Sequence, residues 1–195
     1  VYTDYPEASL ADYAAYSAAF IYEEMQDWDA ALTAYRKLIE THPDSPLADQ
    51  AAYRIGFTAF GRQDFQQAVS LLHKAIEQYP NHPLRAEAQY FIGESYYKTN
   101  AYSRALDAYT RVVDLPENEY ADDAQYSVGW SYFQLGSHED AAEAFQKVAE
   151  ISSTDTLIAS AIFQSGRNHL MAGDRSAARD AFNQVFVKFP DSGDA

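Results

Sequence analysis

Histidines are the residues of this chain best suited to bind a metal ion or to transfer a proton. The chain has five of them, well separated in the sequence: His42, His73, His82, His138 and His169. No two have the spacing of a ligand pair on one helix, and the chain has neither an HExxH motif nor a cysteine. Adjacent carboxylates, such as Glu23-Glu24 and Asp122-Asp123, are typical of a solvated helix face. We therefore predict no catalytic residue, no metal site and no cofactor, and we expect that the chain is not an enzyme.

The charge of the chain excludes further classes of partner. Its 195 residues include 29 acidic and 14 basic side chains, which give a net charge of -15. Such a surface repels phosphate backbones, so we predict no nucleic-acid partner. The phosphate-binding P-loop and GxGxxG motifs are missing, as is the GxSxG motif of hydrolases. No apolar run reaches the roughly 18 residues that a membrane-spanning helix needs, so we predict no direct membrane insertion of this segment.

Aromatic side chains recur at regular intervals and could bind a partner by burying their large, half-polar rings. They fall into three columns that repeat every 36 or 37 residues. The first column holds Tyr16, Tyr53, Tyr90, Tyr126 and Phe163. The second column holds Phe20, Phe57, Glu94, Trp130 and Arg167. The third column holds Glu23, Phe60, Tyr97, Phe133 and Leu170. Steps of three and four residues within each repeat place these positions on one face of a helix.

Small residues repeat with the same period and define the elements that carry the aromatic columns. Glycine recurs at Gly56, Gly93, Gly129 and Gly166. Alanine recurs at Ala31, Ala68, Ala105, Ala141 and Ala178. The apolar spacing around both columns indicates two helices per period, and turn residues separate them. Small residues let the two helices of a hairpin approach closely, and a stack of hairpins buries an apolar face that one hairpin cannot bury.

A further column predicts where each repeat begins. It holds Ser45, His82, Asn118, Asp155 and Ser192. Most of these side chains can accept a hydrogen bond from a free backbone N–H, which is typical of the residue that caps a helix. Pro46 and Pro83 follow at what we expect to be the first helical position.

These columns resemble the tetratricopeptide repeat over essentially the whole chain. The family has a small residue on the first helix, an alanine and an aromatic residue on the second, and a closing proline, with a period of about 34 residues. The resemblance implies an all-α, right-handed superhelical solenoid of five helix-turn-helix repeats in one array, residues 1–195. We place the repeats approximately at residues 8–44, 45–81, 82–117, 118–154 and 155–191. Because both ends fall inside a joint between repeats, we expect the chain to be part of a longer array.

Residues 88–97, AQYFIGESYY, together with Tyr102 and Ala105, are similar to the repeats of bacterial cell-envelope proteins of the YbgF and BamD type. The joints that run from proline to Ala-Asp, as at Ala48-Asp49 and Ala121-Asp122, point the same way. This similarity implies a periplasmic or outer-membrane-associated protein. Otherwise we expect a cytoplasmic one.

The resemblance also implies that the first helices line a concave face where partners bind. The aromatic columns on these helices allow two interpretations. One is a core between successive helices, since regular stacking requires such a column. The other is a groove that receives a peptide or a helix, which suits tyrosine and tryptophan. The first aromatic column leaves both open. For Phe57, Tyr97 and Trp130 we favour binding, because their columns vary between repeats. The predicted contact residues are Tyr16, Phe20, Tyr53, Phe57, Phe60, Tyr90, Glu94, Tyr97, Tyr126, Trp130, Phe133, Phe163 and Arg167.

Taken together, the sequence predicts a scaffold that binds other proteins in a bacterial envelope complex, without naming the partner. Two alternatives remain: a module that binds glycans such as peptidoglycan, and the regulatory repeat region of a larger enzyme. Self-association through the exposed ends of the array is a further possibility that the sequence leaves open.

Overall fold

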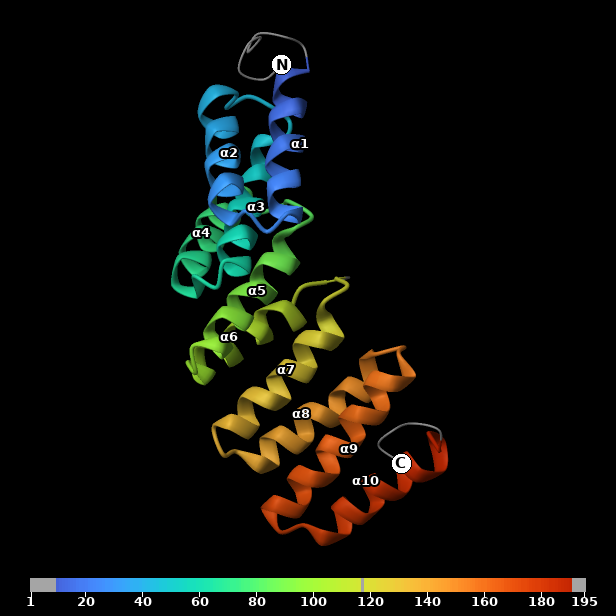
Figure 1. Ribbon diagram of the computed structural model, residues 1–195. Helices are drawn as coiled ribbons and strands as arrows, with labels where there is room; N and C mark the ends of the chain where they lie inside the picture. Colours follow the sequence, from blue (N-terminus) through green and yellow to red (C-terminus); the bar gives the residue numbers. More distant parts are fainter. Residues whose placement is uncertain (1–9, 117, 191–195) are drawn as a thin grey trace. The chain divides into compact units, whose positions relative to one another are not determined.

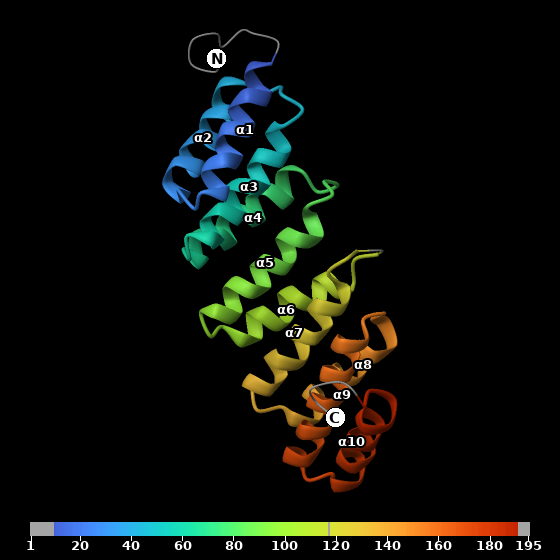
Figure 2. The same ribbon diagram turned by 45° about the vertical axis from the view of Figure 1, so that its right-hand side comes forward.

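The computed structural model describes residues 10–116 and 118–190, and all regular structure within these ranges is α-helical. The helices group into two compact units, residues 1–99 and 100–195. Figures 1 and 2 show the helices of both units. The first unit contains α1 (Ala11–Glu24), α2 (Trp28–Thr41), α3 (Ala48–Gly61), α4 (Phe65–Gln78) and α5 (Arg85–Lys98). The second unit contains α6 (Tyr102–Val113), α7 (Ala121–Gln134), α8 (His138–Ile151), α9 (Asp155–Ala172) and α10 (Arg175–Lys188). Within the described part of the chain, no helix is both long and apolar enough to cross a membrane.

Odd-numbered and even-numbered helices have different roles, and we call them helix A and helix B. Each helix packs against its neighbours in sequence within its unit, as α1 does on α2 and α8 on α9. Helix B buries apolar residues at steps of three and four, such as Ala31, Tyr35 and Leu38 on α2. This spacing forms one apolar stripe on a helix, and the stripe faces the core.

The glycine column of helix A lies directly against a large apolar side chain of helix B. A Cβ placed on Gly56 would stand 2.3 Å from Leu72 Cδ2, and one on Gly129 would stand 2.7 Å from Phe145 Cδ1. Leu72 and Phe145 have no exposed surface. The small residue therefore leaves the space into which helix B inserts its largest core side chain.

The turn from helix A to helix B has the same backbone shape in every hairpin. The residue two before helix B has a positive φ: Gln26, Gln63, Asn100, Gly136 and Gly173. Left-handed backbone suits glycine and asparagine and strains glutamine. The next residue caps helix B in three hairpins, where an aspartate Oδ1 accepts a hydrogen bond from a backbone N–H three residues later: Asp27, Asp64 and Asp174.

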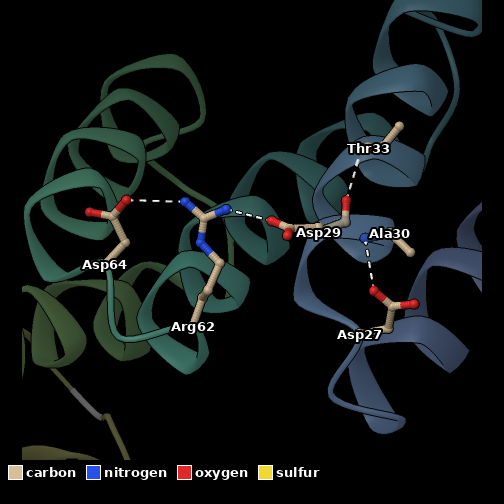
Figure 3. A network of polar contacts seen from close by, with 6 residues as sticks. All are labelled: Asp27, Asp29, Ala30, Thr33, Arg62 and Asp64. Atoms are coloured by element: carbon tan, nitrogen blue, oxygen red, sulfur yellow. Dashed lines mark hydrogen bonds and ion pairs between the residues drawn. The ribbon is translucent and has the colours of Figure 1, made fainter.

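An arginine connects the N-terminal ends of two successive B helices. Arg62 Nη1 donates to Asp29 Oδ1 at 2.5 Å, and Arg62 Nη2 donates to Asp64 Oδ2 at 3.1 Å (Figure 3). Asp29 belongs to the first turn of α2, and Asp64 caps α4. The guanidinium therefore links successive B helices at their N-terminal ends, although exposed ion pairs of this kind contribute little free energy.

The joints between repeats differ from the prediction. Helix A begins at Ala48, Arg85 and Ala121, three residues after Ser45, His82 and Asn118. Each of these three side chains accepts a hydrogen bond from the backbone N–H two residues later, at 3.1 to 3.2 Å. They stabilise a turn that precedes the helix, so the prediction that they cap helix A is wrong.

The other residues of the predicted capping column also lie elsewhere. Pro46 and Pro83 lie within the turn and not at the first helical position. Asp155 is the first residue of α9 and caps nothing. Ser192 lies outside the described residues, as do residues 8, 9, 117 and 191 of the predicted repeat boundaries.

The aspartate of the Ala-Asp motif accepts a hydrogen bond from a serine in the turn that opens the next repeat. Ser45 Oγ donates to Asp12 Oδ2 at 2.7 Å, and Ser152 Oγ donates to Asp122 Oδ2 at 2.8 Å. These hydrogen bonds connect the start of one helix A to the turn that opens the next repeat. The Ser45 hydroxyl thus accepts from its own turn and donates to the preceding repeat, which fixes the turn between them.

Substituting Gly56 tests the close contact between helices A and B. We expect Gly56→Ala to lower the free energy of unfolding by about 1–3 kcal/mol, since overpacking a filled core costs this much. The better helix propensity of alanine, worth about 1 kcal/mol, offsets only part of that cost. Urea denaturation monitored by circular dichroism measures the change.

A double-mutant cycle provides the control. Leu72→Ala removes the side chain that the new methyl group would meet. In that background Gly56→Ala is expected to cost little or to stabilise, because the methyl group enters vacated space. Equal costs in both backgrounds would show that the glycine is not placed there to admit Leu72.

Candidate functional site

The helix-A face of the first unit carries a cluster of phenylalanines. Phe57 and Phe60 come from α3 and Phe91 from α5, and their rings meet edge to face with centroids 5.4 Å (Phe57–Phe91) and 4.7 Å (Phe60–Phe91) apart. Phe57 is only 8% exposed, whereas Phe60 is half-buried. Phe57 therefore packs between two repeats, and Phe60 is the ring of α3 that a partner can reach.

Tyr53 is fully buried, which contradicts its prediction as a contact residue. Its hydroxyl donates to the Tyr79 carbonyl oxygen at 2.8 Å, and its ring stacks on His82 with centroids 4.8 Å apart. A buried tyrosine must satisfy its hydroxyl inside the protein, and this one does so at the joint after α4. Tyr53 belongs to the core in the structure, in agreement with the first of the two interpretations of its column.

At the start of the first unit, a charged pair lies among the aromatic rings. Glu23, which holds the position of Phe60 in the next repeat, accepts a hydrogen bond from the hydroxyl of Tyr35 at 2.8 Å. Arg54 Nη1 lies 3.2 Å from Glu23 Oε1, and its guanidinium stands over the ring of Phe20, 5.2 Å from the centroid. Tyr16 packs its ring edge to face against Tyr35 at 5.5 Å. Tyr16 and Phe20 are both half-buried.

The ionisation of this cluster follows from burial. Tyr35 has no exposed surface, and burial is the main reason why its pKa is raised, with the neighbouring Glu23 carboxylate adding to the effect. Burial is the largest single influence and lowers the pKa of Arg54, but Glu23, Tyr16 and Tyr35 together outweigh burial and raise this pKa. The arginine therefore stays charged beside the aromatic face.

In the second unit, α7 presents three predicted contact residues together. Trp130 lies at the centre, with ring centroids 6.2 Å from Tyr126, 5.4 Å from Phe133 and 5.6 Å from the buried Phe145 of α8. Trp130, Tyr126 and Phe133 are half-buried. The core residue Phe145 thus supports Tyr126 and Trp130 from below, and all three rings remain partly accessible to solvent.

The remaining predicted residues lie on α5 and α9. Tyr90, Glu94 and Tyr97 are half-buried on α5, and the ring of Tyr90 lies 6.0 Å from that of Phe91. On α9, Phe163 is half-buried against Phe182, and Arg167 is exposed with its Nη1 donating to Gln164 Oε1 at 3.0 Å.

Phe91 was missed by the sequence analysis. Its equivalents in the other repeats are polar: Ser17, Arg54, Ser127 and Gln164. A column that is apolar in only one repeat shows no periodic signal, so only the contacts with Phe57 and Phe60 reveal its role.

The described residues contain no group of three or more histidine, aspartate or glutamate side chains that could hold a metal ion. The exposed functional groups of the site are aromatic rings and a few charges. This chemistry suits the binding of another molecule by burial and stacking.

Comparison with known families identifies the repeats. Models of the tetratricopeptide repeat match residues 13–45, 47–118, 117–156 and 160–192. The chain belongs to the tetratricopeptide repeat family. Its all-α, helix-turn-helix fold is the fold class predicted from the sequence.

Solved structures of tetratricopeptide proteins have the same fold. MamA is 23% identical with a TM-score of 0.74, and the match covers 93% of each chain. A MamA from Desulfovibrio magneticus RS-1 is 21% identical with a TM-score of 0.65, covering 91% of this chain and 98% of that one. YrrB is 20% identical with a TM-score of 0.70, covering 98% of this chain and 93% of that one. No curated protein sequence shows a significant match.

Replacing Tyr35 tests the charged cluster in the first tetratricopeptide hairpin. At neutral pH we expect Tyr35→Phe to lower the free energy of unfolding by about 1–3 kcal/mol, the range for losing a hydrogen bond to a charged group. Urea denaturation measures the change.

The same variant has a defined pH dependence. Because the pKa of Tyr35 is raised in the folded state, its stabilising effect is complete below about pH 10, the pKa of a free tyrosine. It is lost as the pH rises further, because the unfolded chain ionises first. Tyr35→Phe should therefore lose stability less steeply above this pH. Burial also raises the pKa of Tyr16 and Tyr53. These two residues therefore still make the stability of the variant fall with rising pH, but less steeply than in the wild type. A decline parallel to that of the wild type would contradict this account.

Proposed function

We propose that this chain is a scaffold that binds a peptide or helix of a partner protein through the aromatic faces of its A helices, within a bacterial cell-envelope complex. Tetratricopeptide proteins are protein–protein interaction scaffolds, and this supports the general class of function. The envelope location rests on the Ala-Asp joints and on the similarity of residues 88–97 to envelope repeats.

The half-buried group of Tyr126, Trp130 and Phe133 carries the proposal. Tryptophan and tyrosine dominate binding energies at interfaces, because their large rings lose little conformational freedom on binding. Here the core residue Phe145 supports two of the rings from behind, with centroids 5.2 Å from Tyr126 and 5.6 Å from Trp130. Rings held in this way are already ordered before a partner arrives, which lowers the entropic cost of binding.

In the first unit, Phe60, Phe20 and Tyr16 offer a second set of half-buried rings, beside the ion pair of Arg54 and Glu23. An aromatic surface of this kind suits a partner segment that has apolar side chains. YrrB, whose structure resembles that of this chain, is described as a TPR protein with an unusual peptide-binding site. That description is consistent with peptide binding here.

Photo-crosslinking at Trp130 tests the proposal. A benzoylphenylalanine at position 130 preserves an aromatic ring and reacts only with a molecule that touches it. We expect irradiation in a bacterial envelope extract to give a defined protein adduct, and we expect fewer adducts in a cytosolic extract. Gel electrophoresis and mass spectrometry identify the products.

The same crosslinker at position 132 is the matched control. Tyr132 is a half-buried aromatic residue of the same helix but lies on a different face, beside α6 and α8. A protein adduct at position 130 alone supports the assigned face. Equal adducts at both positions, or adducts with glycan in place of protein, would contradict the proposal.

A further inference from the structure

A groove that repeats along the chain lies between successive B helices and is separate from the aromatic face. It appears between α2 and α4 over α3, between α6 and α8 over α7, and between α8 and α10 over α9. The volumes are about 280, 440 and 460 Å³ respectively. Ile55 of α3 lines the first groove, whereas Phe57 and Phe60 of the same helix point to the aromatic face.

The first groove has the most apolar floor of the three. Ile39, Ile55 and Leu71 line it: Ile55 is a buried residue of the core formed by α1, α2 and α3, and the half-buried Ile39 and Leu71 pack against that core. At the positions of Ile55 and Leu71, the second groove has Val128 and Ala144. The third groove has Ser165 and Ala181 at these positions. The second groove also has Val113, and the third has the buried Ile162. Among these three grooves, the first is therefore the one that offers a partner two half-buried large aliphatic side chains, Ile39 and Leu71.

The charges at the rim also single out the first groove. Arg36 and Lys74 stand there with one carboxylate, Glu40, and both cations are exposed. Within residues 10–116 and 118–190, neither cation forms an ion pair or a hydrogen bond. A chain with a net charge of -15 has few cations, and two unpaired ones beside an apolar floor form a local positive site.

The equivalent positions in the other grooves lack this charge. Lys147, the counterpart of Lys74, is neutralised by Glu143 at 2.9 Å in a groove that also contains Asp114 and Asp140. The described lining of the third groove has carboxylates and no lysine or arginine. Repeat geometry alone therefore does not explain Arg36 and Lys74, since the same geometry recurs without them.

We propose that the groove between α2 and α4 is a second docking site, and that its occupant is an acidic amphipathic segment of a partner protein. Aliphatic side chains of that segment lie on Ile39 and Leu71, above the buried Ile55. Its flanking carboxylates pair with Arg36 and Lys74. Charge complementarity selects this occupant, because a basic segment would meet two unpaired cations in the first groove and a neutral segment would leave them unpaired.

A synthetic peptide tests this site on the full chain. The probe is a labelled, end-blocked peptide of leucine, alanine and glutamate, with leucines three and four residues apart and glutamates beside them. Fluorescence anisotropy should show binding to the wild type, with the affinity reduced about tenfold or more by the double variant Arg36→Glu, Lys74→Glu. Both residues are exposed, so the variant should remain folded.

The variant Lys98→Glu, Arg111→Glu is the matched control. It makes the same change in net charge at two exposed cations outside the groove. The affinity of this variant for the acidic peptide should stay within about twofold of the wild-type affinity. Methyl NMR should place the shifts of the bound state at Ile39, Ile55 and Leu71. A peptide with serine in place of leucine, or with lysine in place of glutamate, should not bind.

Several results would overturn this site. They are no binding of the acidic peptide, equal losses in the two double variants, binding of the serine peptide, and methyl shifts elsewhere. A loss of self-association in the Arg36→Glu, Lys74→Glu variant, measured by sedimentation, would instead assign the groove to a second copy of the chain. None of these results depends on crosslinking at Trp130, so the two sites can fail separately.

Discussion

In the hairpins of Gly56, Gly129 and Gly166, the packing depends on one feature. A small residue in helix A faces a large apolar residue in helix B. Gly56 faces Leu72, Gly129 faces Phe145 and Gly166 faces Phe182. The two helices can then lie close together, and the large side chain is fully buried at Leu72 and Phe145 and half-buried at Phe182. Because one hairpin leaves its other apolar surfaces uncovered, the contact also commits the chain to stacking repeats. The aromatic face and the grooves between B helices are both products of this stacking.

The connections between helices hold that arrangement in different ways. Within a hairpin, one residue with a positive φ reverses the chain, and in three hairpins an aspartate then caps helix B. Between hairpins, a serine or histidine side chain supports the turn from inside and contacts an aspartate of the preceding repeat. The backbone thus turns sharply at both kinds of connection, and side chains of the connection itself bind some of its N–H groups, which leaves the helix faces free to vary.

The fold was predictable because its signal is repeated. The glycine and alanine columns and the steps of three and four indicated the helices. Glycine recurs in four aligned segments and alanine in five. The joints were less predictable, because Ser45, His82 and Asn118 accept hydrogen bonds from a turn that looks like a helix cap in sequence. A polar side chain precedes the helix both in a helix cap and in this turn. Only the backbone conformation shows which N–H group that side chain binds.

The candidate site was predictable only in part, because one repeat position does not have one environment. Phe57 and Trp130 occupy the same column, yet Phe57 is buried against Phe91 whereas Trp130 is half-buried over Phe145. The difference comes from neighbours that do not repeat, since a phenylalanine stands at position 91 where other repeats have polar residues. Variation within a column therefore has two causes, local packing and a partner, and sequence alone cannot separate them.

The same reasoning applies to the grooves between B helices, but there the repeats themselves provide the comparison. Equivalent positions hold Lys74 and Lys147, and the structure shows that a carboxylate neutralises only the second. Packing does not require an unpaired lysine on an exposed rim, because its charge contributes nothing to the core beneath it. A non-repeating feature that packing does not require is the better indicator of a binding surface. By that criterion, the unpaired charges of Arg36 and Lys74 support the docking site that we propose between α2 and α4.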